Sequence, residues 1–305
     1  MAADRALDNQ KFRGVFPLVR GMAATDSHAS ISHMSQASPL SLLRRHASSA
    51  VTLLLLALHG GALALGWYGG WPWALAGLLC VGLVLAWGTL YPYSRLFGSA
   101  IRSWPCTQRS VILTIDDGPC ADTTEMLDML ESRRVRAVFF LIGEQALQRP
   151  QDVQRIVAAG HLIGNHTHTH PAYTYWSYPP WRQRRELSQC QQALTATGGG
   201  IPKLFRAPVG MRNPYCNLVA GEFALQVIGW QARGLDGVDT PVDQIIAAIR
   251  RGLRPGAIVL LHQGMPHSPE VLRRVLDMLD DGGWTTTLPD SWLAAAASAG
   301  TPAAA

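Results

Sequence analysis

Charged residues are missing from one long part of the sequence, and clustered positive charge is missing from the rest. No Asp, Glu, Lys or Arg occurs between Arg45 and Arg95, a gap of 49 residues in a chain of 305. The formal net charge is +5, and residues 1–106 hold 8 Lys and Arg against 3 Asp and Glu, which is the whole excess. The remainder, with 18 residues of each sign, is neutral. A neutral domain is a poor match for a phosphate backbone, which excludes nucleic acid as the expected partner.

Cysteine is scarce in the sequence and shows no pairing pattern. The five cysteines are an odd number, they form no C-x-x-C pair, and Cys80 lies inside the uncharged stretch. This pattern excludes a disulfide framework and a zinc-finger spacing. The hydrophobic fraction of 48% is ordinary, so the composition also excludes a disordered chain.

The uncharged stretch holds two apolar segments, residues 48–66 and 71–91. Each is close to the ~20 residues that a helix needs to cross a bilayer. A turn-prone spacer, Trp67-Tyr68-Gly69-Gly70, separates them, and aromatic residues flank the second segment as in an interfacial belt. A soluble hairpin would normally have a polar face, and a signal peptide would be shorter and followed by soluble sequence. The sequence therefore predicts a transmembrane helical hairpin over residues 47–92.

Basic residues flank this hairpin at its outer ends. Arg44 and Arg45 precede the first segment, Arg95 follows the second, and the connection between them has no basic residue. The positive-inside rule then places both ends, and the domain that follows, in the cytoplasm. Residues 1–46 are expected to form a disordered basic segment, with Met34 as a candidate for the true start of the protein.

From residue 110 onward, short apolar runs alternate with amphipathic helical patterns. The strand candidates are residues 111–115, 137–142, 161–163, 204–206, 226–230 and 257–262, and the helical patterns cover 126–130, 187–194, 245–253 and 271–279. An Asp122-x-x-Glu125 capping box precedes the first helix. Such alternation predicts parallel βα units in an open sheet or a barrel. We expect a linker over 93–109, a folded α/β domain over 110–292 and a disordered Ala-rich tail over 293–305.

Polar side chains directly follow the first of these strands. Asp116 and Asp117 leave the strand into a Gly118-Pro119 turn, so two adjacent carboxylates can point in different directions and serve different roles. In βα folds, catalytic residues lie at the carboxyl ends of strands. Taken alone, the pair is equally consistent with solvated carboxylates in an Asp-Gly turn.

Three histidines, His166, His168 and His170, follow another strand end within five residues. His166 and His170 have the H-x₃-H spacing of two zinc ligands on a helical turn. On an extended strand the three imidazoles would instead line one face. The alternative to a metal site is a His-rich surface loop that has no specific function. Two further strand ends carry His262 and Arg206, for which a satisfied rim histidine and a structural ion pair are the alternatives.

In this order and over this distance, these motifs resemble those of the polysaccharide deacetylase family, the NodB-homology group of carbohydrate esterase family 4. The resemblance covers roughly residues 110–288. Its motifs are Thr114–Pro119, with Ile115 where Phe is usual, His166–His170, Arg206–Gly210 and Leu260–His262. The resemblance implies a distorted (β/α)7-type barrel, which is preceded here by the predicted transmembrane helical hairpin.

The resemblance also implies roles for individual residues. A divalent metal, usually zinc, would be bound by Asp117, His166 and His170, with an open position for water. Asp116 would act as the general base and His262 as the general acid. The supporting positions are Arg206, which would pair with Asp116 and orient it, Thr167, which would brace the histidine loop, and Pro208 and Val209, which would lie beside the substrate.

One motif departs from the family pattern. The usual D-x-x-D-W element appears as Arg233-Gly234-Leu235-Asp236-Gly237. Asp236 keeps the place of the Asp that tunes the acid histidine. Arg233 replaces the first Asp, and Gly237 replaces the Trp that helps to wall the substrate groove. The departure therefore affects the size of the substrate and leaves the metal chemistry intact.

An aromatic insert, residues 172–185, follows the histidines. Its aromatic side chains are Tyr173, Tyr175, Trp176, Tyr178 and Trp181. The insert is consistent with a sugar-stacking surface, for which we single out Trp176, with a membrane-facing lip, and with ordinary loop packing.

We therefore predict a membrane-anchored, metal-dependent hydrolase that removes N-acetyl groups from an amino-sugar-containing glycan or a lipid-linked saccharide. Its partners would be that N-acetylated carbohydrate or glycolipid, together with membrane lipid. Members of the family more often act outside the cytoplasm, in conflict with the side of the membrane that the flanking charges indicate. Two other classes of function are a catalytically inactive glycan-binding relative and a membrane protein that handles metal through its His-rich loop.

Overall fold

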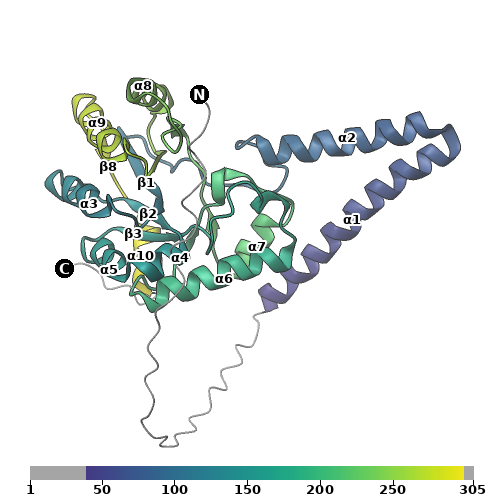
Figure 1. Cartoon of the computed structure of the whole chain (residues 1–305), viewed down its shortest axis with the longest axis horizontal. Coiled ribbons are helices and arrows are strands. Elements are labelled where there is room, and N and C mark those ends of the chain that lie inside the picture. The colour runs from purple at the N-terminus through teal and green to yellow at the C-terminus, as the bar shows by residue number, and fades with distance from the viewer. Residues whose placement is uncertain (1–38, 299–305) are drawn as a thin grey trace, which may run out of the picture. The chain divides into compact units, whose positions relative to one another are not determined.

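The computed structural model describes residues 39–298, with side chains from residue 49 onward. The chain begins with two long helices, α1 (Pro39–Gly69) and α2 (Trp71–Leu90), which are joined at Gly70 (Figure 1). Gly70 has a φ of 92°, a backbone conformation that favours glycine, and it allows the sharp turn between the helices. The predicted break is therefore one residue long, because α1 continues through Trp67, Tyr68 and Gly69.

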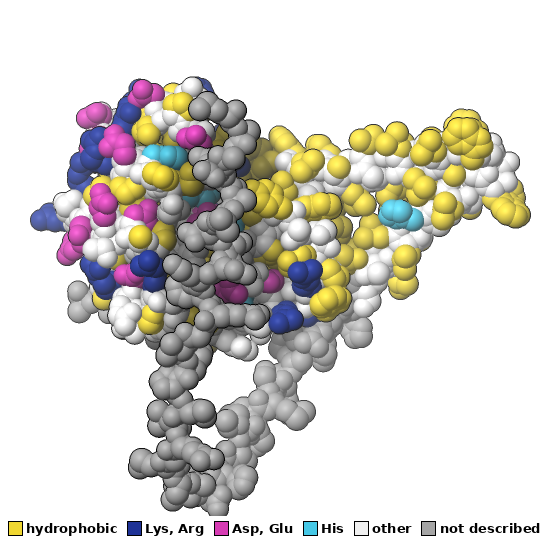
Figure 2. Space-filling model, viewed as in Figure 1, with side chains coloured by type: hydrophobic (Ala, Val, Ile, Leu, Met, Phe, Trp, Pro, Cys, Tyr) yellow, Lys and Arg dark blue, Asp and Glu magenta, His cyan; other side chains and the backbone are white. Residues whose placement is uncertain are grey.

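Both helices are candidates for membrane spans. Residues 49–69 and 71–90 are long and apolar enough to cross a bilayer, and few of their side chains are buried. Figure 2 shows hydrophobic side chains along both helices, whereas the Lys, Arg, Asp and Glu side chains in this view gather on the rest of the molecule. The disorder predicted for residues 39–46 is wrong, since α1 begins at Pro39. Met34 and the remainder of the predicted basic segment lie outside the described residues.

The rest of the described chain is built around one parallel sheet. Its strands are β1 (Ser110–Gly118), β2 (Val138–Leu141), β3 (Leu162–Asn165), β4 (Leu204–Phe205), β5 (Gln226–Val227), β6 (Ala232–Arg233), β7 (Ala257–His262) and β8 (Thr285–Thr286). The order is β5-β4-β3-β2-β1-β7-β6, with β8 paired to β1 outside this path. The seven strands of the path curl into a half-barrel, which confirms the predicted α/β fold of the (β/α)7 type.

Strand β1 shows why the sheet is covered on both sides. All of Val111 to Ile115 is fully buried; Val111, Leu113 and Ile115 enter one hydrophobic cluster, whereas Ile112 enters another. A strand buried on both faces reads as a continuous apolar run, which is the pattern of a parallel sheet with helices on each side. The first cluster includes residues from α3 (Thr123–Ser132), α5 (Pro150–Ala158), α6 (Pro180–Ala196), α8 (Val242–Gly252) and α9 (Ser268–Asp281).

The remaining helices include one that corrects a prediction. Besides α4 (Gly143–Gln148) and α7 (Cys216–Glu222), the structure contains α10 (Asp290–Ser298). Disorder was predicted from residue 293, but helix α10 is anchored by the buried Trp292, which packs in the cluster around Ile112. That prediction is therefore wrong for residues 293–298, and residues 299–305 lie outside the described part of the chain.

The predicted capping box at the start of α3 is also wrong. Asp122 precedes the helix but has helical backbone angles and makes no side-chain cap hydrogen bond. Its carboxylate instead accepts hydrogen bonds from the Cys120 thiol and from the Gly264 backbone N–H. Asp122 therefore joins the loop after β1 to the loop after β7.

The predicted linker, residues 93–109, packs against the domain. The Ile101 N–H donates to Val227 O, and the Gly229 N–H donates to Ile101 O at 2.8 Å. Arg212 donates through Nη2 to the carbonyl of Ser94, also at 2.8 Å. Because these bonds hold the segment along the end of the sheet beside β5, it is part of the folded domain.

Candidate active site

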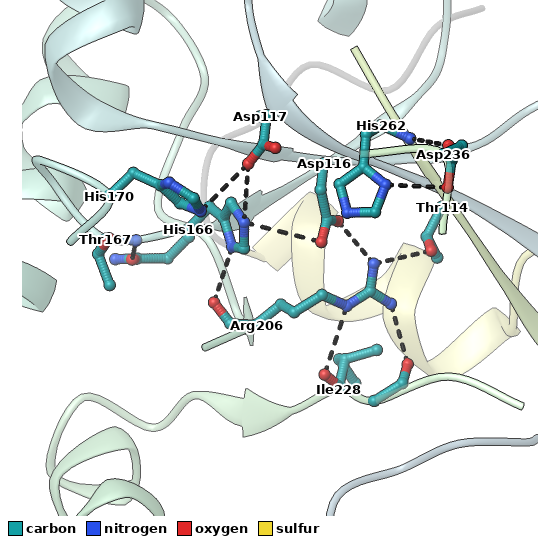
Figure 3. Close-up of polar contacts among 12 residues, drawn as sticks. Thr114, Asp116, Asp117, His166, Thr167, His170, Arg206, Ile228, Asp236 and His262 are labelled. Carbon is teal, nitrogen blue, oxygen red and sulfur yellow. Dashed lines mark hydrogen bonds and ion pairs between the residues drawn. The ribbon is translucent and has the colours of Figure 1, made fainter. Parts of the chain in front are cut away.

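The polar residues singled out in the sequence meet at the carboxyl ends of β1, β3, β4 and β7. Asp116 and Asp117 end β1, and Asp116 is in register with His262 at the end of β7. His166 follows β3, and Arg206 follows β4, where its N–H donates to Asn165 O at 3.1 Å. Figure 3 shows their side chains turned toward one another from these separate strands.

Asp117, His166 and His170 form a cluster that fits a metal ion. The Nε2 atoms of both histidines lie 3.2 Å from Asp117 Oδ1, and one possible ligand atom from each residue lies within 4.8 Å of the others. Asp117 Oδ1 is buried and accepts no hydrogen bond from the described residues. A buried carboxylate oxygen and two imidazole nitrogens thus converge on one point, where a cation can bind all three. One carboxylate with two imidazoles is a ligand set that zinc accepts. The three residues therefore fit the predicted metal.

The protonation of Asp117 and His170 is consistent with cation binding. Burial raises the pKa of Asp117, but the adjacent His166 ring and the charges of His166 and His170 outweigh it and hold that pKa well below its ordinary value. Burial and the neighbouring His166 lower the pKa of His170 to about 4. At neutral pH Asp117 is thus ionised and His170 is neutral, and both are the forms that bind metals. His166 Nδ1 lies 2.8 Å from Arg206 O, which leaves its Nε2 facing Asp117.

The histidines lie neither on a helical turn nor on an extended strand. After β3 the backbone enters positive φ at Thr167 (69°) and again at His170 (49°), so the loop coils and brings His166 and His170 together. Their ring centroids are 4.8 Å apart. His168 is not part of the cluster, and its Nδ1 is buried without a hydrogen-bond partner among the described residues.

Two buried residues that were not singled out in the sequence hold this loop. The Asn165 side chain accepts from Thr167 N at 2.9 Å and donates to Leu187 O. Glu186, on α6, accepts from the backbone N–H groups of His168 and Thr169 at 3.0 and 2.9 Å. Thr167 therefore braces the loop through its backbone, since its buried hydroxyl has no hydrogen-bond partner within the described chain. The sequence did offer one sign of this role, because Glu186 is a charged residue on the apolar face of α6.

Asp116 is held by an arginine, as predicted. Arg206 Nη1 donates to Asp116 Oδ1 at 2.6 Å, and both side chains are almost fully buried. The guanidinium also donates to Thr114 Oγ1 and to the carbonyls of Ile228 and Gly229. Its charge and its donors are thus used within the protein, and Asp116 Oδ2 remains directed at the cluster, 3.7 Å from His166 Nε2.

His262 is held in turn by Asp236. Asp236 Oδ2 accepts from the His262 backbone N–H at 2.7 Å, and Oδ1 lies 3.0 Å from the ring Nδ1. Burial lowers the pKa of His262, but Asp236, Asp116 and Asp117 outweigh it and raise the pKa to about 9. His262 is therefore protonated at neutral pH and can donate a proton.

A cleft opens over these groups. It is lined by Asp116, Asp117, His166, His170, Ala172, Tyr173, Val209, Gly210, Trp230, Arg233, Leu235, Gly237, Val238, Leu260 and His262. Seven non-glycine residues of the described chain have positive φ, and five of these lie in or beside the cleft: Asp117, Thr167, His170, Val209 and Leu235. Backbone conformations of this kind cluster where a function requires a defined geometry.

The aromatic insert divides into two groups. Tyr175 and Tyr178 are buried in a hydrophobic cluster, so these two serve ordinary packing. Tyr173 is 90% exposed and lines the cleft. Trp176 does not line the cleft; its indole N–H donates to Tyr173 O at 2.9 Å. Tyr173 is therefore better placed than Trp176 for contact with a bound molecule. Pro208 is buried, whereas Val209, next to it, lines the cleft.

Known proteins share these motifs and this fold. A family model described as polysaccharide deacetylase matches residues 105–228. The chain is 36% identical over 166 residues to a chitooligosaccharide deacetylase of Bradyrhizobium sp. (strain ANU 289), a match that covers 53% of this chain and 74% of that protein. It is 31% identical over 193 residues to a peptidoglycan-N-acetylglucosamine deacetylase of Bacillus cereus, covering 61% of this chain and 70% of that protein.

A solved structure agrees with these sequence matches. A family 4 carbohydrate esterase from Streptomyces lividans, in complex with acetate, is similar with a TM-score of 0.55 and 32% identity, over 60% of this chain and 94% of that one. The shared sequence extends over most of the length of these relatives. The range matched by the family model includes Asp116, Asp117, His166, His170 and Arg206. The chain belongs to the polysaccharide deacetylase family.

Proposed function

We propose that this protein is a metal-dependent hydrolase that removes the acetyl group from an N-acetylated amino sugar, in a glycan or a lipid-linked saccharide. The observation that carries the proposal is the position of a base and an acid beside a metal-binding cluster. Asp116 and His262 are register partners on adjacent strands, and Asp117, His166 and His170 lie next to them. The names of the relatives support an N-acetylglucosamine-containing substrate.

Asp117, His166 and His170 would hold the ion, which we propose to be zinc. When bound, a divalent metal polarises a carbonyl and lowers the pKa of bound water to about 7. This chemistry is needed because an acetamide is a poor electrophile and water is a poor nucleophile at neutral pH.

The chain's own residues move the protons. Asp116 accepts a proton from the attacking water through Oδ2, because Arg206 occupies Oδ1. His262 then donates its proton from Nε2 to the departing nitrogen, because Asp236 fixes the Nδ1 side of the ring. The C–N bond breaks as the new C–O bond is completed, and the products are acetate and the free amine of the sugar.

We further propose that α1 and α2 anchor this enzyme in a membrane. The support is their length, their apolar composition and their exposure. The arginines outside the hairpin favour a cytoplasmic active site. A reporter fused after Ala305 tests this orientation: a signal from a cytoplasm-specific reporter is expected, and a signal only from a periplasm-specific reporter would overturn it.

Acetate release tests the catalytic proposal. Full-length protein in detergent, loaded with zinc, should release acetate from chitooligosaccharides or from an N-acetylated glycolipid extract. Asp116→Asn should abolish release and retain the metal, whereas His166→Ala should lose both. Retained metal with no turnover of any acetylated sugar by the unmutated protein would favour a glycan-binding relative. Metal loss in His166→Ala with undiminished acetate release would contradict the mechanism.

A further inference from the structure

One cation in the cleft is not used by the groups described so far. Arg233, on β6, lines the cleft together with Trp230, Leu260 and His262. Its guanidinium carbon lies over the Trp230 ring, 5.1 Å from the ring centroid, and the side chain is partly buried. Arg233 is in register with Leu260 on β7, two residues before His262. It therefore lies on the side of the cleft where the proposed acid acts.

Each carboxylate of the cleft is already held by another partner. Asp116 pairs with Arg206, and Asp117 faces the two histidines. Asp236 is the carboxylate whose charge acts on Arg233, but its two oxygens are taken by the backbone and the ring of His262. Within residues 39–298, Arg233 forms neither an ion pair nor a hydrogen bond.

A partly buried guanidinium without an ion pair has lost water and gained no directly bound anion in return. Burial of a charge is costly unless it is paired, and the planar guanidinium is suited to two parallel hydrogen bonds with a carboxylate or phosphate. Residues 107–305 carry equal numbers of positive and negative side chains, so this cation does not reflect a net basic domain. An anion arriving with the substrate would complete the site.

We infer that Arg233 binds an anionic group of the substrate, a phosphate or a carboxylate, next to the acetamido sugar. The inference rests on the proposed deacetylation and specifies the substrate further. The two anions point to different substrates: a phosphate is what links a sugar to a lipid or nucleotide, and a carboxylate is what an acidic glycan carries. Exposed Leu235 and Val238 also line the cleft, so an apolar surface is available beside the anion.

Matched pairs of substrates test this inference. The first pair is the octyl glycoside of N-acetylglucosamine and N-acetylglucosamine 1-(octyl phosphate). The second is di-N-acetylchitobiose and the disaccharide of N-acetylglucosamine with N-acetylmuramic acid, which adds a carboxylate. The readout is the ratio of kcat/KM for the anionic member to that for the neutral member, measured by acetate release with full-length protein. Binding of the same compounds to Asp116→Asn, measured by calorimetry, gives a second ratio that does not require turnover.

We expect the anionic member of at least one pair to be favoured about 10-fold, as for a hydrogen-bonded charge pair. The pair that shows the preference identifies phosphate or carboxylate. Arg233→Gln should reduce the ratio about 10-fold, and Arg233→Lys should restore part of it because the charge remains. Arg250→Gln, the same change at an exposed position on α8, should leave the ratio as in the unmutated protein. Added salt should weaken the preference.

The ratio of kcat/KM values compares two substrates of the same variant, so a general loss of activity in that variant does not affect it. Equal use of neutral and anionic members by the unmutated protein, or an unchanged ratio in Arg233→Gln, would overturn the assignment of Arg233 and leave the deacetylase proposal in place. No acetate from any substrate would instead overturn the proposed function.

Discussion

Asp236 holds His262 at two points, with Oδ2 2.7 Å from the backbone nitrogen and Oδ1 3.0 Å from ring Nδ1. The carboxylate thereby fixes the orientation of the ring and stabilises its protonated form. Asp236 is fully enclosed, so its charge acts on the histidine at short range.

Removal of this charge should shift the pH dependence of catalysis. In the intact protein the pKa of His262 is about 9, so the proton donor is present at neutral pH and is lost as the pH rises through 9. In Asp236→Asn the pKa falls, and we expect the basic limb of the kcat profile to move down by about one to two pH units, with kcat at pH 8 reduced roughly 2- to 10-fold. Acetate release from pH 5 to 10 measures both. A basic limb at its original pH would show that His262 is not the donor.

The stability of the fold should depend on keeping both charges of the buried Arg206–Asp116 pair. Arg206→Met leaves the Asp116 carboxylate buried without its cation, and we expect the free energy of unfolding to fall by about 3–5 kcal/mol. The double variant Arg206→Met/Asp116→Asn removes that charge as well and should recover part of the loss. Urea denaturation of the two single variants and the double variant measures the coupling. Strict additivity of the two changes would contradict it.

Glu186 is expected to act on metal binding through the histidine loop. It accepts three hydrogen bonds from His168 and Thr169, and it contacts none of the proposed ligands. Glu186→Ala should therefore loosen the loop and weaken zinc affinity by about 10- to 100-fold, the usual effect of losing a group that supports metal ligands. Competition with a zinc-binding dye measures the affinity.

A control variant separates this effect from a simple loss of charge. Glu125→Gln, on the exposed face of α3, removes one negative charge away from the loop and should leave the zinc affinity unchanged. If both variants lose affinity equally, the electrostatic field of the domain is responsible and the hydrogen bonds of Glu186 are not.

Tyr173 should contribute to the binding of sugar. Its ring is almost entirely exposed at the rim of the cleft, where a sugar can stack on it. We expect Tyr173→Ala to raise KM for a chitooligosaccharide by about 10-fold with a smaller change in kcat, as for an interaction present in both ground and transition states. Trp181→Ala, in the same insert but outside the cleft lining, is the matched control. Equal effects of the two variants would exclude a specific contact by Tyr173.

His161 should make the fold sensitive to acid. It is buried, its Nδ1 accepts the Ala137 N–H, and burial lowers its pKa to about 4 from an ordinary 6.5. The unfolded chain binds this proton first, so stability is full above pH 6.5 and decreases as the pH falls toward 4, by on the order of 3 kcal/mol. His161→Gln does not titrate, and the difference in unfolding free energy between the two proteins should shrink or reverse as pH is lowered. A difference independent of pH would refute this.

The metal cluster and the Asp116–Arg206 pair could be predicted from the sequence because short motifs at strand ends resemble those of a known family. The apolar runs of β1 and β7 likewise identified two adjacent buried strands of the sheet. The two-residue strands β6 and β8 could not be predicted, since two residues have no detectable periodicity. Arg233 was noticed as a departure from a motif, but its position in the cleft depends on the register of β6 with β7.

Other misses have the same origin in tertiary packing. Whether Tyr173 or Trp176 lines the cleft depends on the path of the insert around the buried Tyr175. No local sequence pattern indicates that Tyr175 is buried. The spacing of His166 and His170 was compatible with a helix or a strand, whereas the positive φ angles at Thr167 and His170 produce a coil. The helical tail at α10 is explained by one residue, Trp292, which finds a place in the core.

The packed segment before β1 has a consequence for how such an enzyme would meet its substrate. Only Tyr91, Pro92 and Tyr93 lie between the end of α2 and Ser94, whose carbonyl Arg212 holds. In the proposed membrane-anchored enzyme, no long flexible linker therefore separates the catalytic domain from the membrane-spanning helices. The active site then stays close to the membrane, which favours substrates that are themselves held at the bilayer surface.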